Sequence, residues 1–132
     1  MLQEIVTGNA AQVVTSSTNG WVVGYFMPPG IAQSSNFEIK IWHYDEQPDY
    51  GQKTFHGTEF IIVEGGTLVF LLDVPDGHGN FILDQAVELQ GSAREWVILP
   101  PGCKKQVRVL KAPAYGITVR WPSAPGMNAV VG

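Results

Sequence analysis

Hydrophobic and polar residues alternate along several short segments of the chain, with the period of two that is typical of β-strands. The longest alternation runs through residues 36–44. One face of this segment would carry Phe37, Ile39, Ile41 and His43, and the other would carry Glu38, Lys40 and Trp42. We expect the face with the isoleucines to point toward the core, which would place His43 inward.

Glycine and proline divide the chain into nine strand candidates. These are residues 21–27, 36–44, 60–63, 67–73, 81–83, 86–89, 95–99, 105–110 and 117–121. Gly65-Gly66 would form a turn or bulge between two apolar strands, because glycine adopts positive φ at little cost. The pattern predicts an all-β fold, an antiparallel sandwich or barrel. Its expected core includes Ile61, Val63, Val107 and Val109.

Length and composition indicate one domain that spans residues 1–132. Charged residues make up 15% of the chain, the net charge is −4, and there is no basic block. We therefore expect no binding to nucleic acid or to an anionic membrane, and no apolar run approaches the ~18 residues of a membrane span. With one cysteine, Cys103, the chain forms no internal disulfide, and its first residues do not read as a signal peptide. Both observations fit a cytoplasmic protein.

Two motifs carry a family resemblance. The first is F-H-G-T-E-F-I-I-V-E-G-G at residues 55–66, and the second is L-P-P-G-C-K-K-Q at residues 99–106. Together they resemble the end of the first cupin motif and the core of the second. The resemblance covers residues 37–121 and implies a double-stranded β-helix, the jelly-roll barrel of cupins, with a small molecule bound inside.

The same resemblance implies where metal ligands would lie. Typical cupins hold a divalent metal with two histidines and a glutamate from the first motif and one histidine from the second. In this chain the four positions fall at Lys53, Phe55, Glu59 and Lys105. We therefore expect no full metal site and no cofactor. The alternative is a reduced site of His43, His56 and Glu59, whose ligand types suit iron, manganese or nickel.

Five side chains are candidates for the site. Glu59 and His56 would transfer protons, because a carboxyl group in a barrel and an imidazole near neutral pH can act as acid or base. Lys53 and Lys105 would neutralise Glu59 or hold an anion such as a carboxylate or phosphate, and His43 would contact the ligand. The competing interpretation makes the lysines and Glu59 solvated or paired surface groups, and the histidines ordinary loop and rim residues.

Three functions are compatible with these residues. The first is binding or conversion of a small polar molecule, a sugar or a carboxylate, without the full metal site. The second is a metal-dependent enzyme, of dioxygenase or isomerase type, with the reduced site. The third is a non-catalytic ligand-binding or sensory protein. Residues 11–27 would supply β-strands that join two copies into a homodimer, the commonest symmetric assembly.

Overall fold

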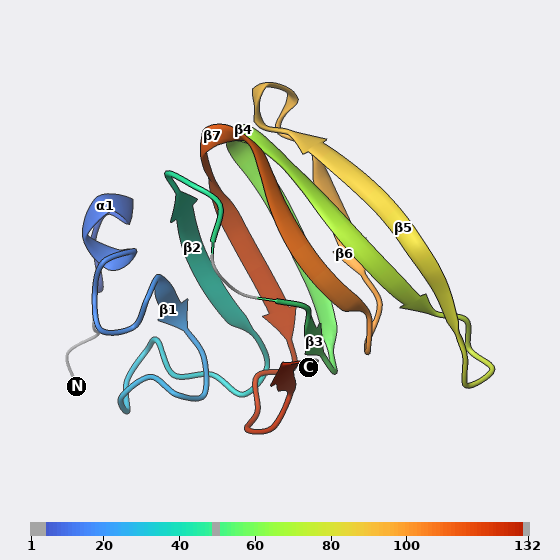
Figure 1. Ribbon diagram of the computed structural model, residues 1–132. Helices are drawn as coiled ribbons and strands as arrows, with labels where there is room; N and C mark the ends of the chain where they lie inside the picture. Colours follow the sequence, from blue (N-terminus) through green and yellow to red (C-terminus); the bar gives the residue numbers. More distant parts are fainter. Residues whose placement is uncertain (1–4, 49–50, 131–132) are drawn as a thin grey trace.

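The chain folds into a barrel of antiparallel β-strands with little helix (Figure 1). The computed structural model describes residues 5–48 and 51–130. In chain order the elements are α1 (Ala10–Val13), β1 (Trp21–Val23), β2 (Glu38–Tyr44), β3 (Lys53–Phe55), β4 (Thr58–Pro75), β5 (Phe81–Gln90), the 3-10 helix η1 (Gly91–Ala93), β6 (Trp96–Leu99), β7 (Lys104–Trp121) and β8 (Asn128–Val130). The all-β antiparallel class predicted from the alternation is therefore confirmed.

Two long strands, β4 and β7, hold the barrel together. They pair with each other from Thr58 opposite Trp121 to Asp73 opposite Lys104. The first half of β4 and the second half of β7 form one layer with β6 and β2. The other halves form a second layer with β5 and β3 (Figure 1). Because both strands pass from one layer into the other, side chains from the two layers meet inside the barrel.

The two layers join where β4 bends at Gly65 and Gly66. The register between β4 and β7 shifts between Val63 and Leu68, and Gly66 has a φ of +73°. This is the bulge that the Gly65-Gly66 pair predicts, since positive φ is costly for residues with a Cβ. The bulge bends β4 without ending it, so the pairing with β7 continues on both sides.

Several strand candidates are parts of longer strands. Residues 60–63 and 67–73 both belong to β4, residues 81–83 and 86–89 to β5, and residues 105–110 and 117–121 to β7. Two further short strands, β3 and β8, pair with each other at one end of the barrel. The sequence prediction divided these strands because glycine, proline and polar residues were interpreted as chain turns. A bulge bends a strand but leaves its hydrogen-bonded pairing intact on both sides.

The core lies between the two layers. Ile61 and Val63 on β4 and Val107 on β7 are buried, and Val109 is half-buried against them. Leu68, Phe70 and Leu72 come from the second half of β4, and Leu89 and Leu99 from β5 and β6. The predicted burial of the valines and of Ile61 is confirmed, because the alternation on β4 and β7 matches the pleat of a sheet with one buried face.

The expected orientation of β2 is wrong. Glu38 and Trp42 are the buried side chains of this strand, whereas Phe37 is 41% exposed and His43 is exposed. The charged face of β2 therefore points into the barrel and the face with the isoleucines points out. The rule that apolar faces turn inward fails here because this part of the interior holds charged groups that pair with one another.

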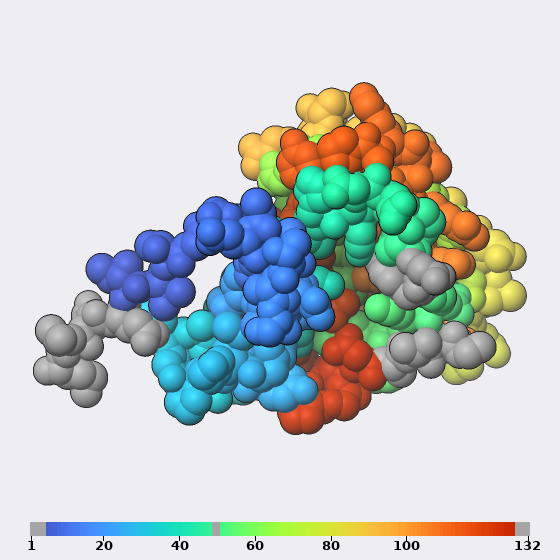
Figure 2. Space-filling view, turned by 60° about the vertical axis from the view of Figure 1, so that its left-hand side comes forward, coloured from blue at the N-terminus to red at the C-terminus, as the bar shows by residue number. Residues whose placement is uncertain are grey.

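The N-terminal segment also differs from expectation. Residues 10–13 form a one-turn helix, α1, in which Asn9 caps the first turn by accepting a hydrogen bond from the Gln12 amide. Only residues 21–23 of the expected strands are extended, and β1 pairs with β2. The segment is therefore a short helix and a short strand on the outside of the barrel (Figure 2). In the described residues, no helix has the length and apolar character needed to cross a membrane.

We predict that Gly66→Ala destabilises the barrel much more than Gly77→Ala. Both glycines have positive φ, so each alanine costs about 1–2 kcal/mol in backbone conformation. A methyl group on Gly66 would also collide with backbone atoms of Lys111, Pro113 and Ala114, whereas Gly77 has open space around it. Urea unfolding followed by circular dichroism should show a difference of about 2 kcal/mol or more. Equal losses in the two variants would contradict this account of the bend.

Candidate functional site

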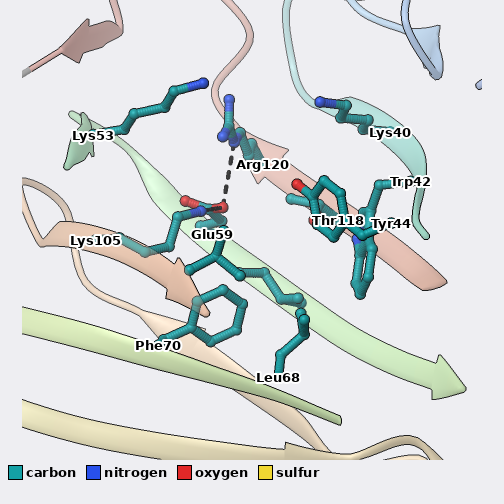
Figure 3. A pocket seen from close by; sticks show the side chains of 12 residues that line it. Lys40, Trp42, Tyr44, Lys53, Glu59, Leu68, Phe70, Lys105, Thr118 and Arg120 are labelled. Carbon is teal, nitrogen blue, oxygen red and sulfur yellow. Dashed lines mark hydrogen bonds and ion pairs between the residues drawn. The ribbon is translucent and has the colours of Figure 1, made fainter. Parts of the chain in front are cut away.

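A pocket of about 80 Å³ opens inside the barrel, and five of its twelve lining side chains are charged (Figure 3). Strands β2, β3, β4 and β7 supply its walls. Its charged residues are Lys40, Lys53, Glu59, Lys105 and Arg120. Its remaining walls are Trp42, Tyr44, Ile61, Leu68, Phe70, Val107 and Thr118. The pocket thus combines an apolar floor with converging charges, the composition that is usual for small-molecule sites.

The register of three neighbouring strands places a row of charges at one end of the pocket. Arg120 on β7 lies directly between Glu38 on β2 and Glu59 on β4. Directly opposed residues on neighbouring strands project to the same face of a sheet. The two carboxylates therefore flank one guanidinium group, and Arg120 Nε lies 3.6 Å from Glu59 Oε1.

Glu59 also forms an ion pair across the barrel with Lys105. Lys105 stands on the first half of β7, next to Leu72, so the pair joins the two layers. The Glu59 residue is only 3% exposed. Burial by itself would raise its pKa, but Lys105 and Arg120 outweigh burial and hold the pKa below its ordinary value of 4.5. Glu59 is therefore an ionised carboxylate that already has its partners.

Arg120 is held by two aromatic rings as well as by Glu59. Its guanidinium carbon lies 5.1 Å from the ring centroid of Trp21 and 4.9 Å from that of Phe55. Its Nη1 donates a hydrogen bond of 2.8 Å to Asn128 Oδ1. Phe55, which stands where the resemblance implies a metal-binding histidine, thus packs against a guanidinium group. Cation–π contacts of this kind fix the plane of the guanidinium group.

Two more lysines approach the same end of the pocket as Arg120 (Figure 3). Burial, followed by repulsion from Arg120, lowers the pKa of Lys53. The pKa of Lys40 falls to about 8, chiefly through burial and then through the charges of Arg120, Lys53 and Lys105, while Glu59 opposes the change. Lys53 and Lys105 also stand directly opposite each other on β3 and β7. Like charges in that arrangement repel.

The pocket therefore has a surplus of positive charge. Four of its lining side chains are cations and one, Glu59, is a carboxylate. Glu38 lies behind Arg120, is only 2% exposed, and burial raises its pKa above the ordinary value. Its Oε1 atom has no hydrogen-bond partner among the described residues. The protein as a whole carries a net charge of −4, so the charge of the pocket lining has the opposite sign to that of the whole chain.

The structure brings three of the five candidate site residues together. Glu59, Lys53 and Lys105 all line the pocket. His56 does not, because it lies in the turn between β3 and β4 with its side chain exposed. His43 points outward from β2, where its ring stacks on Tyr115 and its Nε2 lies 2.8 Å from Asp45 Oδ1. The expectations that His56 and His43 reach the site are therefore wrong.

The residues at the four positions implied by the cupin motifs do not fit a divalent metal. They are two lysines, a phenylalanine and the already paired Glu59. The alternative set of His43, His56 and Glu59 does not converge, since the two histidines are exposed and Glu59 is buried. Across residues 5–48 and 51–130, no three His, Cys, Asp or Glu side chains are grouped as metal ligands.

Sequence reasoning missed Arg120, Lys40 and Glu38. Lys40 and Glu38 lie on the face of β2 that the alternation assigned to the outside. Arg120 is near the end of the last long strand, where a single arginine carries no motif. The available signal was three charged residues, Glu38, Lys40 and Arg120, in strands that otherwise read as core. Only the pairing of β2 with β7 shows that they share one face.

No protein-family model and no curated protein matches the chain. Solved structures share its fold. A cupin superfamily protein from Desulfitobacterium hafniense superposes with a TM-score of 0.54 at 13% identity, over 68% of this chain and 71% of its own. A Klebsiella pneumoniae protein with a double-stranded β-helix domain gives 0.59 at 13% identity, over 95% of this chain and 90% of its own.

A third structure is an enzyme, the DMSP lyase DddQ from Ruegeria pomeroyi. Its TM-score is 0.60 at 13% identity, and the match covers 87% of this chain but only 53% of the lyase. The chain therefore has the double-stranded β-helix fold found in cupin superfamily proteins, as its two motifs imply. At this level of identity the likeness shows the fold alone, so the function has to be inferred from the pocket itself.

We predict that Glu59→Gln lowers the free energy of unfolding at pH 7 by about 3–5 kcal/mol, because it leaves Lys105 and Arg120 without their carboxylate. The lowered pKa means that the contribution of ionised Glu59 is present above pH 4.5 and is lost as pH falls through the folded-state pKa. The difference between wild type and Glu59→Gln should therefore shrink in acid.

Urea unfolding at pH 3 to 8 measures this difference. The double variant Glu59→Gln/Lys105→Met should recover part of the loss, because it removes a buried charge together with its partner. Glu46→Gln, at an exposed glutamate, serves as the control and should change stability by less than about 0.5 kcal/mol. A loss in Glu59→Gln that is no larger than in Glu46→Gln would refute the structural role of the ion pair.

Proposed function

We propose that the protein binds a small carboxylate anion inside the barrel. The observation that carries this proposal is the surplus of cations in the pocket, four against the single carboxylate of Glu59. Cationic clusters inside a low-dielectric wall focus their field and attract anions. Lys53 and Lys105 stand directly opposite each other, and a bound anion would reduce the repulsion between them.

The size and walls of the pocket favour a small ligand. Its 80 Å³ is about half of the ~150 Å³ cavity that accommodates benzene in a well-studied protein. A molecule of three or four carbons would place its carboxylate near Arg120 and the lysines, with its carbon atoms against Trp42 and Phe70. Glu59 would hold Arg120 and Lys105 in place and would not itself contact the anion. A dianion such as phosphate shares part of this chemistry but has no group for the apolar wall.

Titration with lactate, followed by NMR chemical shifts, tests the proposal against glycerol as the uncharged control. We predict saturable binding of lactate, no binding of glycerol, and a loss of about tenfold or more in affinity in Arg120→Gln. Arg108→Gln is the matched control, because Arg108 is on the same strand but is exposed and does not line the pocket. Equal affinity for lactate and glycerol would refute an anion site, and preferential binding of inorganic phosphate would refute the carboxylate assignment.

The affinity should also depend on pH. Lys40, with its pKa of about 8, is protonated below that value and attracts the anion, so binding should weaken as pH rises from 7 to 9. Lys53 also has a lowered pKa and contributes to the decrease at higher pH. In Lys40→Met the step near pH 8 should disappear, and only the later decrease should remain. An unchanged pH profile in Lys40→Met would exclude Lys40 from the anion site.

We also propose that the protein is a homodimer. The N-terminal part and the loop after β1 lie side by side (Figure 2) and expose apolar side chains, with Ile5 at 88% and Val6 and Ile31 each at 65%. Exposed apolar surface is often covered by a partner, and twofold pairing of identical chains is the commonest assembly. A second copy of this chain is the proposed partner.

Light scattering should report a dimer at micromolar concentration, and Ile31→Asp should shift the protein toward the monomer. Ile82→Asp is the matched control, since Ile82 is also exposed, at 51%, but lies on β5 at the far side of the barrel (Figure 1). A monomeric wild type would contradict the proposal. A shift that is as large in Ile82→Asp as in Ile31→Asp would place the interface elsewhere.

A further inference from the structure

Lys105 and Arg120 both contact Glu59, whereas Lys40 forms no ion pair with any residue that the structure describes. Lys105 pairs with Glu59, and Arg120 contacts Glu59 and Asn128. The Lys40 ammonium forms no hydrogen bond or ion pair with any residue in the described parts of the chain. Its contact is with the face of the Trp21 ring, whose centroid lies 5.5 Å from Nζ. No carboxylate of the described residues therefore pairs directly with the Lys40 ammonium group.

The surroundings of Lys40 favour the neutral amine. Desolvation acts first, and Arg120, Lys53 and Lys105 add repulsion, while Glu59 is the single opposing charge. Together they bring the pKa to about 8, so that a substantial share of the side chain is unprotonated in weak base. A lysine that is desolvated or placed next to other cations is the usual form of an amine nucleophile.

We propose that Lys40 forms an imine with the carbonyl carbon of a 2-oxo acid bound in this pocket. The inference rests on the proposed function, because the carboxylate of the ligand is what Arg120 and the lysines would hold. It extends that function from an anion site to a site for a particular class of carboxylate. It also makes Lys40 a nucleophile, in addition to a cation that attracts the ligand.

The step is balanced and needs no oxidant or reductant. The Lys40 nitrogen donates its lone pair to the carbonyl carbon, so a C–N bond forms and the carbonyl oxygen takes up a proton to give a carbinolamine. Loss of a proton from nitrogen and departure of the oxygen as water then give the C=N bond. An amine and a ketone thus become an imine and one water molecule. Protons exchange with water at the mouth of the pocket.

The residues around Lys40 fit this chemistry. Thr118 stands directly opposite Lys40 in the strand pairing and lines the pocket with it. The Thr118 side chain forms no hydrogen bond with any residue in the described ranges, so its hydroxyl is available to the ligand oxygen. Trp42 and Tyr44 lie on the same face of β2 as Lys40 and line the pocket beside it. The pocket volume of about 80 Å³ suits a three-carbon 2-oxo acid better than a sugar.

Reductive trapping with pyruvate and cyanoborohydride at pH 8 tests the inference on the full chain. Hydride reduces an imine to a stable secondary amine, so the intact mass should rise by one carboxyethyl group. Peptide mapping should place the group on Lys40, and excess lactate should protect the site. Trapping should fall about tenfold or more in Lys40→Arg, because a guanidinium group is not a nucleophile at this pH. Lys111→Arg, at an exposed lysine outside the pocket, should trap like wild type.

The outcomes separate this inference from the proposed function. If lactate binds in the NMR titration but pyruvate leaves no adduct on Lys40, the anion site stands and the imine is refuted. If neither acid binds, both proposals fail. An adduct on Lys53 or Lys105 would show that the nucleophile is not Lys40 and would overturn the inference. Adducts spread over surface lysines, without protection by lactate, would show nonspecific reaction and would also overturn the inference.

Discussion

The ionised carboxylate of Glu59, buried inside a β-barrel, is the constraint on which the site depends. An isolated charge in such a place would be strongly unfavourable. Two cations offset this penalty: Lys105 lies in the opposite layer, and Arg120 lies on the strand next to Glu59. The pair with Lys105 joins the two layers across the interior. Arg120 in turn lies against the aromatic rings of Trp21 and Phe55.

The negative charge of a buried glutamate can be neutralised by a metal ion or by cationic side chains. In the metal-binding pattern that the cupin motifs imply, a glutamate at this position would neutralise a divalent ion together with histidines. Here lysine and phenylalanine occupy the other ligand positions, and the positive charge belongs to side chains of the protein. Four of the lining side chains are cations and one is a carboxylate, and the proposed anion site rests on this difference. The fold is thus shared with cupin superfamily proteins, while the residues at the implied ligand positions depart from the metal-binding pattern.

The parts of the site that could be read from the sequence are those that belong to local motifs. Glu59 and Lys105 were placed by their spacing within the two motifs, and both line the pocket. Lys40 and Arg120 lie outside any motif and reach the pocket through the pairing of β2 with β7, which brings positions eighty residues apart onto one face. His43 and His56 illustrate the opposite error, since a suitable residue type near a motif says nothing about the direction of its side chain.

The sequence by itself determined the fold class, the bend at Gly65-Gly66 and the buried faces of β4 and β7, because each depends on the period of two or on the freedom of glycine. The tertiary structure decided which face of β2 points inward. That choice depends on the free energy of whole charge clusters: Glu38, Lys40, Glu59, Lys105 and Arg120 are tolerable inside only when strands distant in the chain bring opposite charges together. The local hydrophobic pattern of a strand does not show which charged residues will lie opposite it, because strand register determines those pairs.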